Sequence, residues 1–269
     1  MGAYGMRLAA LFLACLPLHS AAFVNSIRCQ NVQTCVTTWP VTSGNLLVVG
    51  TSWAMIGAGT ISDSQGNSYT LIGSGDTYLG HRRLRGTVLS SGGGVVTVKS
   101  STVESNIVIA EFSGVTLQVL TSAAYGAPGT FASCPPSAPL SVTTTTSVLL
   151  LSMWVMDSGA AVTCAASSGV LLPGASCGGF TQQMDYQFVP AGTYSQQFAV
   201  VPSFSGGDTN CGVYALPASA PAPQLLSLEQ NIPSGLLRAT ILMPDQSTLF
   251  VVGVPYPTPA FPIIWVPLK

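Results

Sequence analysis

The chain of 269 residues is sparsely charged. Eight Lys and Arg and nine Asp and Glu make up 6% of the residues and give a net charge of -1, while 48% of the residues are hydrophobic. This composition excludes an intrinsically disordered chain, which needs low hydrophobicity and high charge. It argues against nucleic-acid binding, because no surplus of basic residues is present to displace counterions from phosphates. The scarcity of Glu and Lys argues against a coiled coil or helical bundle.

The first 22 residues have the pattern of a secretory signal peptide. Arg7 precedes an apolar run at residues 8–18, and the small residues Ser20 and Ala22 follow it. We therefore predict a signal peptide over residues 1–22, cleaved after Ala22, and a secreted or extracellular-surface location. Two alternatives stay open: retention of the segment as an anchor, and a lipoprotein signal at Cys15. No other stretch is long enough to span a bilayer, so we expect no stable membrane span after cleavage.

Short runs rich in Val, Thr, Ile and aromatic residues follow at regular intervals, with Gly, Pro and Asp between them. This pattern predicts an all-β fold, namely an antiparallel β-sandwich over residues 23–216 that is jelly-roll-like or Ig-like. Residues 46–49, 107–110 and 149–151 are apolar at every position, which is typical of strands buried on both faces. We predict strands at residues 34–39, 45–54, 68–72, 86–90, 95–100, 106–112, 147–156, 180–188, 193–201 and 211–216.

The last 53 residues are Pro-rich and apolar, and we assign residues 217–269 to a linker and a C-terminal β extension. Alternating Pro and small residues at 217–223 indicate a stiff spacer. Strands are expected at residues 225–228, 236–243, 248–254 and 261–267. So short a segment cannot easily bury its own apolar surface. We therefore expect it to pack on the main domain, a sister subunit or another partner, with Phe261 and Trp265 as assembly residues.

Six cysteines remain once Cys15 is removed with the signal peptide. An even number of cysteines in an exported chain indicates disulfides, whereas zinc sites usually show closer Cys or His spacing. Fifteen pairings of six cysteines are possible, so the sequence leaves the connectivity open. Close spacing favours Cys29–Cys35 and Cys164–Cys177, which would leave Cys134–Cys211 as a longer link.

Four motifs occur in order along the first half of the chain: GNLLVV at 44–49, SDSQGNSYTL at 62–71, GVVTV at 94–98 and IAEFSGV at 109–115. In this order they resemble an uncharacterised β-sandwich module of secreted bacterial and phage surface proteins. That module combines a GN-aliphatic strand, a DSxGNxYT hairpin and an E-aromatic-SG strand end. The resemblance covers residues 37–216 at most. It implies a β-sandwich and says little about function.

Catalytic chemistry finds little support in the residues, and we expect neither an enzyme nor a cofactor. His81 is the one histidine of the mature chain, and it lies upstream of the single GxSxG string at residues 174–178. A nucleophile elbow needs its histidine downstream, so a hydrolase triad is not expected. Glu111 is the one carboxylate inside an apolar strand. We expect an ion pair with Arg82, Arg83 or Arg85 to stabilise it there.

Weak binding candidates are of three kinds. The cluster of His81, Arg82, Arg83 and Arg85 suits an acidic glycan, a lipid head group or a carboxylate, although a solvated loop explains it equally simply. Trp39 lies before a proline and is available for sugar stacking or an interface, whereas Trp53 and Trp154 are expected in the core. Asp63 and Asn67 are weak calcium candidates, with a plain hairpin turn as the simpler interpretation. We otherwise expect no metal.

The low charge leads to the functional expectation. A free monomer of this composition is poorly protected against association, so much of its surface is expected to be covered by neighbours. We therefore expect a non-catalytic extracellular structural or assembly protein of a cell surface, filament or virion. It would form a homo-oligomer or polymer through apolar surface and strand edges. The alternative is a carbohydrate-binding or adhesion module with a glycan as its ligand.

Overall fold

The computed structural model describes most of the chain as β-strands and the turns between them. In the described residues every regular element is a strand, and the paired strands are antiparallel, as the composition and patterning predict. Residues 21–219 form one compact unit. The described residues are 21–52, 60–73, 82–128, 131–156, 163–165, 170–172, 181–204, 208–219, 224–231, 236–242, 248–253 and 264–266.

The first half of this unit forms a six-stranded curled sheet with the order β1-β6-β2-β5-β4, in which β3 also pairs with β6. The curl comes from β6, whose first residues pair with β3 and the end of β1 while its last residues pair with β2. Sequence patterning predicts two strands here, whereas the structure has one of 17 residues. The strands are β1 (Ala22–Val36), β2 (Leu46–Ser52), β3 (Ile61–Asp63), β4 (Thr70–Leu71), β5 (Arg82–Val88) and β6 (Thr97–Ser113).

The second half contributes a five-stranded sheet of order β12-β13-β10-β16-β7. Its strands are β7 (Thr121–Pro128), β10 (Val148–Met156), β12 (Val170–Leu171), β13 (Thr181–Val189) and β16 (Asp208–Pro217). Two small sheets, β11-β15-β8 and β14-β9, complete this half. Their strands are β8 (Phe131–Cys134), β9 (Leu140–Thr144), β11 (Thr163–Ala165), β14 (Gly192–Gln196) and β15 (Phe198–Phe204).

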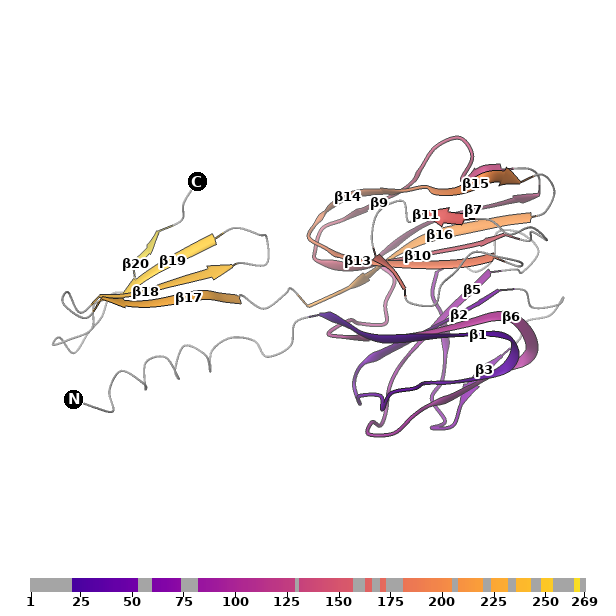
Figure 1. Cartoon of the computed structure of the whole chain (residues 1–269), viewed down its shortest axis with the longest axis horizontal. Helices are drawn as coiled ribbons and strands as arrows, with labels where there is room; N and C mark the ends of the chain where they lie inside the picture. Colours follow the sequence, from indigo (N-terminus) through magenta and orange to yellow (C-terminus); the bar gives the residue numbers. More distant parts are fainter. Residues whose placement is uncertain are drawn as a thin grey trace. The chain divides into compact units, whose positions relative to one another are not determined.

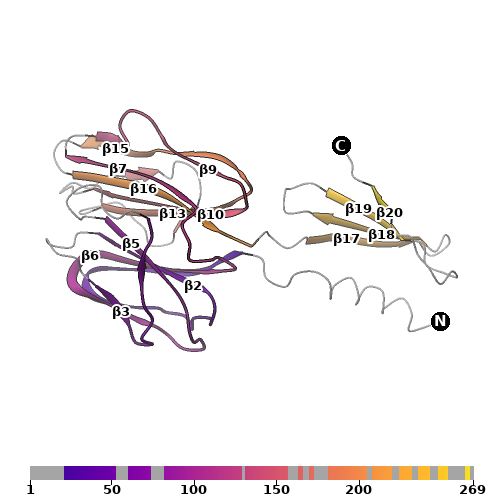
Figure 2. The same cartoon turned by 180° about the vertical axis from the view of Figure 1, so that it is seen from behind.

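The two large sheets lie face to face, with the small sheets outside the second one (Figure 1). Three hydrophobic cores result. The central core lies between the large sheets and includes Phe112 and Met153. The first outer core lies within the curl of the first sheet, around Ile109. The second outer core lies between the second sheet and the small ones, around Trp154. Figure 2 shows the same layers from behind.

Strands β2 and β10 are buried on both faces, as their continuous apolar runs predict. In β2, Leu46 belongs to the central core and Leu47 to the first outer core. In β10, Leu149 belongs to the central core and Leu150 to the second outer core. Alternate residues of a strand face opposite sides of the sheet, so each of these strands stabilises two cores at once.

Two of the expected disulfides are confirmed. Cys29–Cys35 joins two residues of β1, six positions apart in the sequence. Cys134–Cys211 joins β8 to β16 across 77 positions and is buried in the second outer core. The third expected pair involves Cys177, which lies outside the described residues.

The strands from Gln224 onward form a separate sheet of order β17-β18-β19-β20. Its strands are β17 (Gln224–Asn231), β18 (Leu236–Leu242), β19 (Thr248–Gly253) and β20 (Ile264–Val266), near the positions that the sequence predicts. This sheet lies outside the compact sandwich unit, which ends at Ser219. At that end of the sandwich, the backbone N–H of Ala21 donates to the carbonyl of Ser219 at 3.4 Å.

Candidate functional site

Glu111 lies at the centre of a buried polar cluster that fixes the loop before β2. Its Oε1 accepts hydrogen bonds from the backbone N–H of Thr42 at 2.9 Å and from Asn45 Nδ2 at 2.6 Å. Its Oε2 accepts from Trp39 Nε1 at 2.5 Å, and Glu111 itself has no exposed surface. We name the group formed by Trp39, Thr42, Asn45 and Glu111 the glutamate clasp.

The glutamate clasp corrects two expectations. The hydrogen-bond partners of Glu111 are an indole, a backbone amide and a side-chain amide, rather than the expected Arg82, Arg83 or Arg85. Trp39 is 7% exposed and belongs to the first outer core, so it offers no platform for a sugar. The physical reason is the same for both, since a buried carboxylate needs donors and the indole N–H supplies one. The clasp stabilises the fold and is closed to ligands.

Asp63 uses both of its carboxylate oxygens within its own hairpin. Oδ1 accepts from the backbone N–H groups of Gln65 and Asn67, at 2.9 and 3.0 Å. Oδ2 accepts from Asn67 Nδ2 and the Tyr69 hydroxyl, both at 2.8 Å. Burial raises the pKa of Asp63, but these hydrogen bonds outweigh it and hold that pKa below its usual value. Gly66 completes the turn with φ +75°, a conformation that favours glycine.

A calcium ion at this hairpin would have to displace four donors from Asp63. The remaining candidate ligand, Asn67 Oδ1, accepts from both the backbone N–H and the hydroxyl of Ser90, at 3.2 and 2.9 Å. Within the described part of the chain no group of three or more His, Cys, Asp or Glu is placed to hold a metal. The hairpin and its bonds to Ser90 therefore act as a structural turn.

The basic cluster lies mostly in a strand rather than a loop. Arg82, Arg83 and Arg85 belong to β5, where they pair in register with Ser52, Thr51 and Val49 of β2. Strand alternation places positions 83 and 85 on one face of the sheet and position 82 on the other. The three residues therefore do not form one continuous basic patch. His81, Trp53, Phe261 and the GxSxG string at 174–178 lie outside the described residues, and of Trp265 only its position in β20 is described.

Trp154 lies in the core, as the sequence predicts, and a further aromatic cluster closes the central core beside β1. Phe23 stacks on Tyr186 with ring centroids 4.9 Å apart, and both rings meet Phe112 edge to face. The stacking covers one face of each of these two rings and ties them to Phe112 in the central core. The cluster anchors the start of β1. Burial raises the pKa of the Tyr186 hydroxyl.

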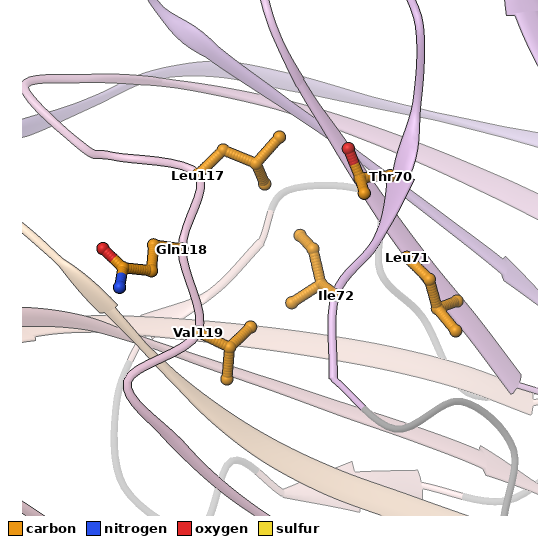
Figure 3. Close-up of a pocket in the computed structure, with 6 residues that line it drawn as sticks. All are labelled: Thr70, Leu71, Ile72, Leu117, Gln118 and Val119. Atoms are coloured by element: carbon orange, nitrogen blue, oxygen red, sulfur yellow. The ribbon is translucent and has the colours of Figure 1, made fainter.

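The remaining candidate is the open edge of the first sheet, at β4. Thr70 and Leu71 pair with Gly86 and Arg85 of β5, and β4 has no strand partner on its other side among the described strands. Beside this edge lies a shallow pocket of about 70 Å³, lined by Thr70, Leu71, Ile72, Leu117, Gln118 and Val119. Ile72, Leu117 and Val119 point toward one another across it, while Gln118 points away (Figure 3).

Two exposed apolar side chains belong to this region. Leu71, in β4, is 43% exposed, and Leu120, which follows the pocket residue Val119 in the chain, is 44% exposed. None of the six residues that line the pocket is charged. An unpaired strand edge beside apolar surface is the usual place for another strand to add to a sheet. We name the edge formed by Leu71, Leu120 and the pocket residues the β4 edge. The sequence predicts a strand at residues 68–72, but not that this strand lies at a sheet edge beside residues 117–119, because the pairing of strands is not visible in local patterns.

Comparison with known protein families, with curated proteins and with solved structures finds no match for this chain. In the described residues no helix has the length and apolarity needed to cross a membrane.

Proposed function

We propose that the chain is a non-catalytic structural or assembly protein of an extracellular surface, filament or virion, and that it self-associates through apolar surface and strand edges. The observation that carries this proposal is the β4 edge, where an unpaired strand lies beside an uncharged pocket and two exposed apolar side chains, Leu71 and Leu120. Such an edge can accept a strand from a neighbouring copy, which would satisfy its backbone N–H and C=O groups.

Composition and covalent chemistry support the same proposal. Only 6% of the residues are charged, so like-charge repulsion between copies is weak. Two disulfides are typical of proteins that fold in an oxidising compartment. The glutamate clasp and the Asp63 hairpin engage the two best catalytic or metal-binding candidates in structural hydrogen bonds. The β4 edge is then the feature most suited to a function.

The test is the assembly state of the full-length chain, purified from an oxidising expression host. Size-exclusion chromatography with light scattering and electron microscopy should show oligomers or ordered polymers. Leu71→Lys should reduce them, because a lysine at an edge strand disfavours strand addition. Val95→Lys is the matched control, since Val95 is 53% exposed and lies in the turn before β6, outside the β4 edge. A monodisperse monomer at high concentration would overturn the proposal.

A further inference from the structure

Strands β1 and β6 bend together, and their pairing is interrupted at the bend. The first arm of β1, residues 22–32, pairs with residues 104–113 of β6, and the second arm, residues 34–36, pairs with residues 97–99. Between the two arms β1 advances by two residues, from 32 to 34, while β6 recedes by five, from 104 to 99. Such an irregularity bends a strand pair and disrupts its ladder locally. The second arm is therefore joined to β6 by three register pairs.

The disulfide Cys29–Cys35 spans this bend. Cys29 lies in the first arm and is in register with Ile107. Cys35 lies in the second arm and is in register with Val98. Ile107, Val98 and Cys35 belong to the first outer core, and Cys29 packs against it. Because residues directly opposite one another share a face, the disulfide lies on the inner side of the curl, where it holds the two arms of β1 together.

The two described disulfides differ in their access to solvent. Cys134 and Cys211 are 0% exposed. Cys35 is 1% exposed, whereas its partner Cys29 is only partly buried. Thiol–disulfide exchange begins when a thiolate attacks one of the two sulfurs, so its rate depends on access to that sulfur. A reductant can therefore approach the first disulfide from the Cys29 side while the sandwich stays folded, whereas the second is enclosed.

The second arm leads directly into the glutamate clasp. The backbone N–H of Thr37 donates to the carbonyl of Val96 at 2.9 Å, and the Thr37 hydroxyl donates to the carbonyl of Trp39 at 3.0 Å. Trp39 in turn donates to Glu111. Cys35, two residues before Thr37, is the point at which this segment is cross-linked to the first arm. Without that cross-link the segment is held by hydrogen bonds and packing, and its local opening costs less free energy.

We propose that Cys29–Cys35 is a thiol-exchange site, and that its reduction by a dithiol loosens the second arm of β1 and the clasp loop, residues 37–45, while the rest of the sandwich stays folded. In a reducing environment the clasp loop would thus stay loosened until the chain meets an oxidant. This site is additional to the proposed function, because it does not require that copies associate.

The exchange proceeds in two steps. One thiolate of the dithiol attacks Cys29 Sγ, the S–S bond breaks, and its electron pair leaves on Cys35 Sγ, which takes up a proton. The second thiolate of the dithiol then displaces Cys29 from the mixed disulfide, and the Cys29 thiolate takes up a proton in its turn. Two electrons pass to the two cysteines, and the dithiol becomes a disulfide.

The first test measures which disulfide opens. The full-length chain, purified with its disulfides formed, is treated with dithiothreitol at neutral pH without denaturant. Alkylation at successive times and peptide mass spectrometry identify the cysteines that have become thiols. Cys29 and Cys35 should be alkylated at least about tenfold faster than Cys134 and Cys211, because burial protects the second pair.

Hydrogen exchange of the selectively reduced chain measures the consequence. The backbone N–H groups of Thr37, Val41 and Thr42 are hydrogen-bonded while the disulfide is formed. After reduction they should exchange at least about tenfold faster, because the opening of a segment with fewer constraints costs less free energy. The amides of β10, in the second sheet, should exchange at an unchanged rate.

Two double variants separate this site from a general loss of stability. Cys29→Ser with Cys35→Ser should show fast exchange in the clasp loop without dithiothreitol and should not respond to the reagent. Cys134→Ala with Cys211→Ala is the matched control, because it removes the other described disulfide. Its clasp loop should still respond to dithiothreitol. If either variant fails to fold, the alkylation and exchange of the wild-type chain decide.

Three results would overturn the proposal: reduction of both disulfides at equal rates, reduction that occurs only when the whole chain unfolds, or selective reduction of Cys29–Cys35 that leaves exchange in the clasp loop unchanged. Loss of the β-structure signal in far-UV circular dichroism after selective reduction would overturn it as well, because the disulfide would then be needed for the entire fold. Selective reduction with faster exchange confined to residues 34–45 would support it.

Discussion

The two outer cores of the sandwich are closed by different chemistry. In the first half, the glutamate clasp and the Asp63 hairpin tie loops to strands through hydrogen bonds, and the disulfide Cys29–Cys35 links only two residues of the same strand. In the second half, Cys134–Cys211 joins β8 to β16 covalently, and Trp154 Nε1 donates to Thr209 Oγ1 at 2.7 Å beside it. The hydrogen bonds of the first half stabilise the folded state. A cross-link over 77 positions stabilises the protein chiefly by lowering the conformational entropy of the unfolded chain.

A similar contrast appears between one acid of each half, Asp63, which is partly exposed, and Asp185, which is buried. Asp63 accepts four hydrogen bonds, which hold its pKa below the usual value against the opposite effect of burial. Asp185 of β13 is almost fully buried, and burial raises its pKa to about 6 although Gln183 Nε2 donates to both of its oxygens. The surroundings of Asp63 therefore favour its charged form, whereas those of Asp185 disfavour the charged form.

The largest expected effect is the loss of the long disulfide. Cys134→Ala with Cys211→Ala should lower the free energy of unfolding by about 4.5 kcal/mol, because the link closes a loop of 77 residues. Cys29→Ala with Cys35→Ala is the control and should cost about 2 kcal/mol, since its loop is only six residues long. Denaturant unfolding under oxidising conditions measures both, and equal losses would contradict the explanation by loop length.

Removal of the clasp carboxylate comes next. Glu111→Ala leaves the donors of Trp39, Thr42 and Asn45 unpaired in the core, and should cost about 4 kcal/mol. Glu111→Gln retains one acceptor oxygen and should cost about half as much. The same unfolding measurement checks this prediction. A cost below about 1 kcal/mol for Glu111→Ala would mean that the clasp contributes little to stability.

Asp185 should make the second half more stable in acid than at neutral pH. Its folded pKa of about 6 exceeds the usual value of 3.8, so the folded state retains a proton that the unfolded chain has released between those values. Stability from this group is therefore complete below pH 4 and falls as pH rises through 6. Asp185→Asn should stabilise the chain by up to about 3 kcal/mol at pH 8 and change little at pH 4. A difference from wild type that stays constant with pH would contradict this.

The smallest effect is expected at the Asp63 hairpin, with the opposite sign of pH dependence. Because the folded pKa of Asp63 is lowered, its stabilisation is present above pH 4 and is lost as pH falls through that lowered pKa. Tyr69→Phe removes one hydrogen bond to Asp63 and should cost about 1 kcal/mol at neutral pH and less in acid. Tyr194→Phe removes a hydroxyl bond to the Pro190 carbonyl and should show no such dependence on pH in thermal melts.

Much of the fold could be predicted from local patterns. The continuous apolar runs of β2 and β10 placed both strands between two cores, and Pro-rich spacing separated the C-terminal strands from the rest. Strand β1 was largely missed, because an edge strand with bulges and half-buried polar residues shows no clean alternation. The division of β6 failed because polar residues in the middle of the strand look like a turn when the curl of the sheet is unknown.

The candidate sites were harder to predict, because their chemistry depends on partners far apart in the sequence. Trp39 and Glu111 are 72 positions apart, so neither indicates the other before the chain is folded. The resemblance motifs turn out to be hydrogen-bonded structural units, in which Asn45 bonds Glu111 and Asp63 bonds Tyr69. The β4 edge arises where two-residue β4 meets residues 117–119, and periodicity cannot reveal an edge of that length.

Phe23 at the start of the sandwich is in register with Phe112, and Ala218 at its finish forms a bridge with Val115, so the start and the finish lie close together. A unit whose two connections leave from neighbouring points can be grafted into a surface loop of another protein without forcing the ends of that loop apart. Joining those points with a short peptide would equally allow new termini to be opened elsewhere. The sandwich is therefore suited to insertion into other proteins and to circular permutation.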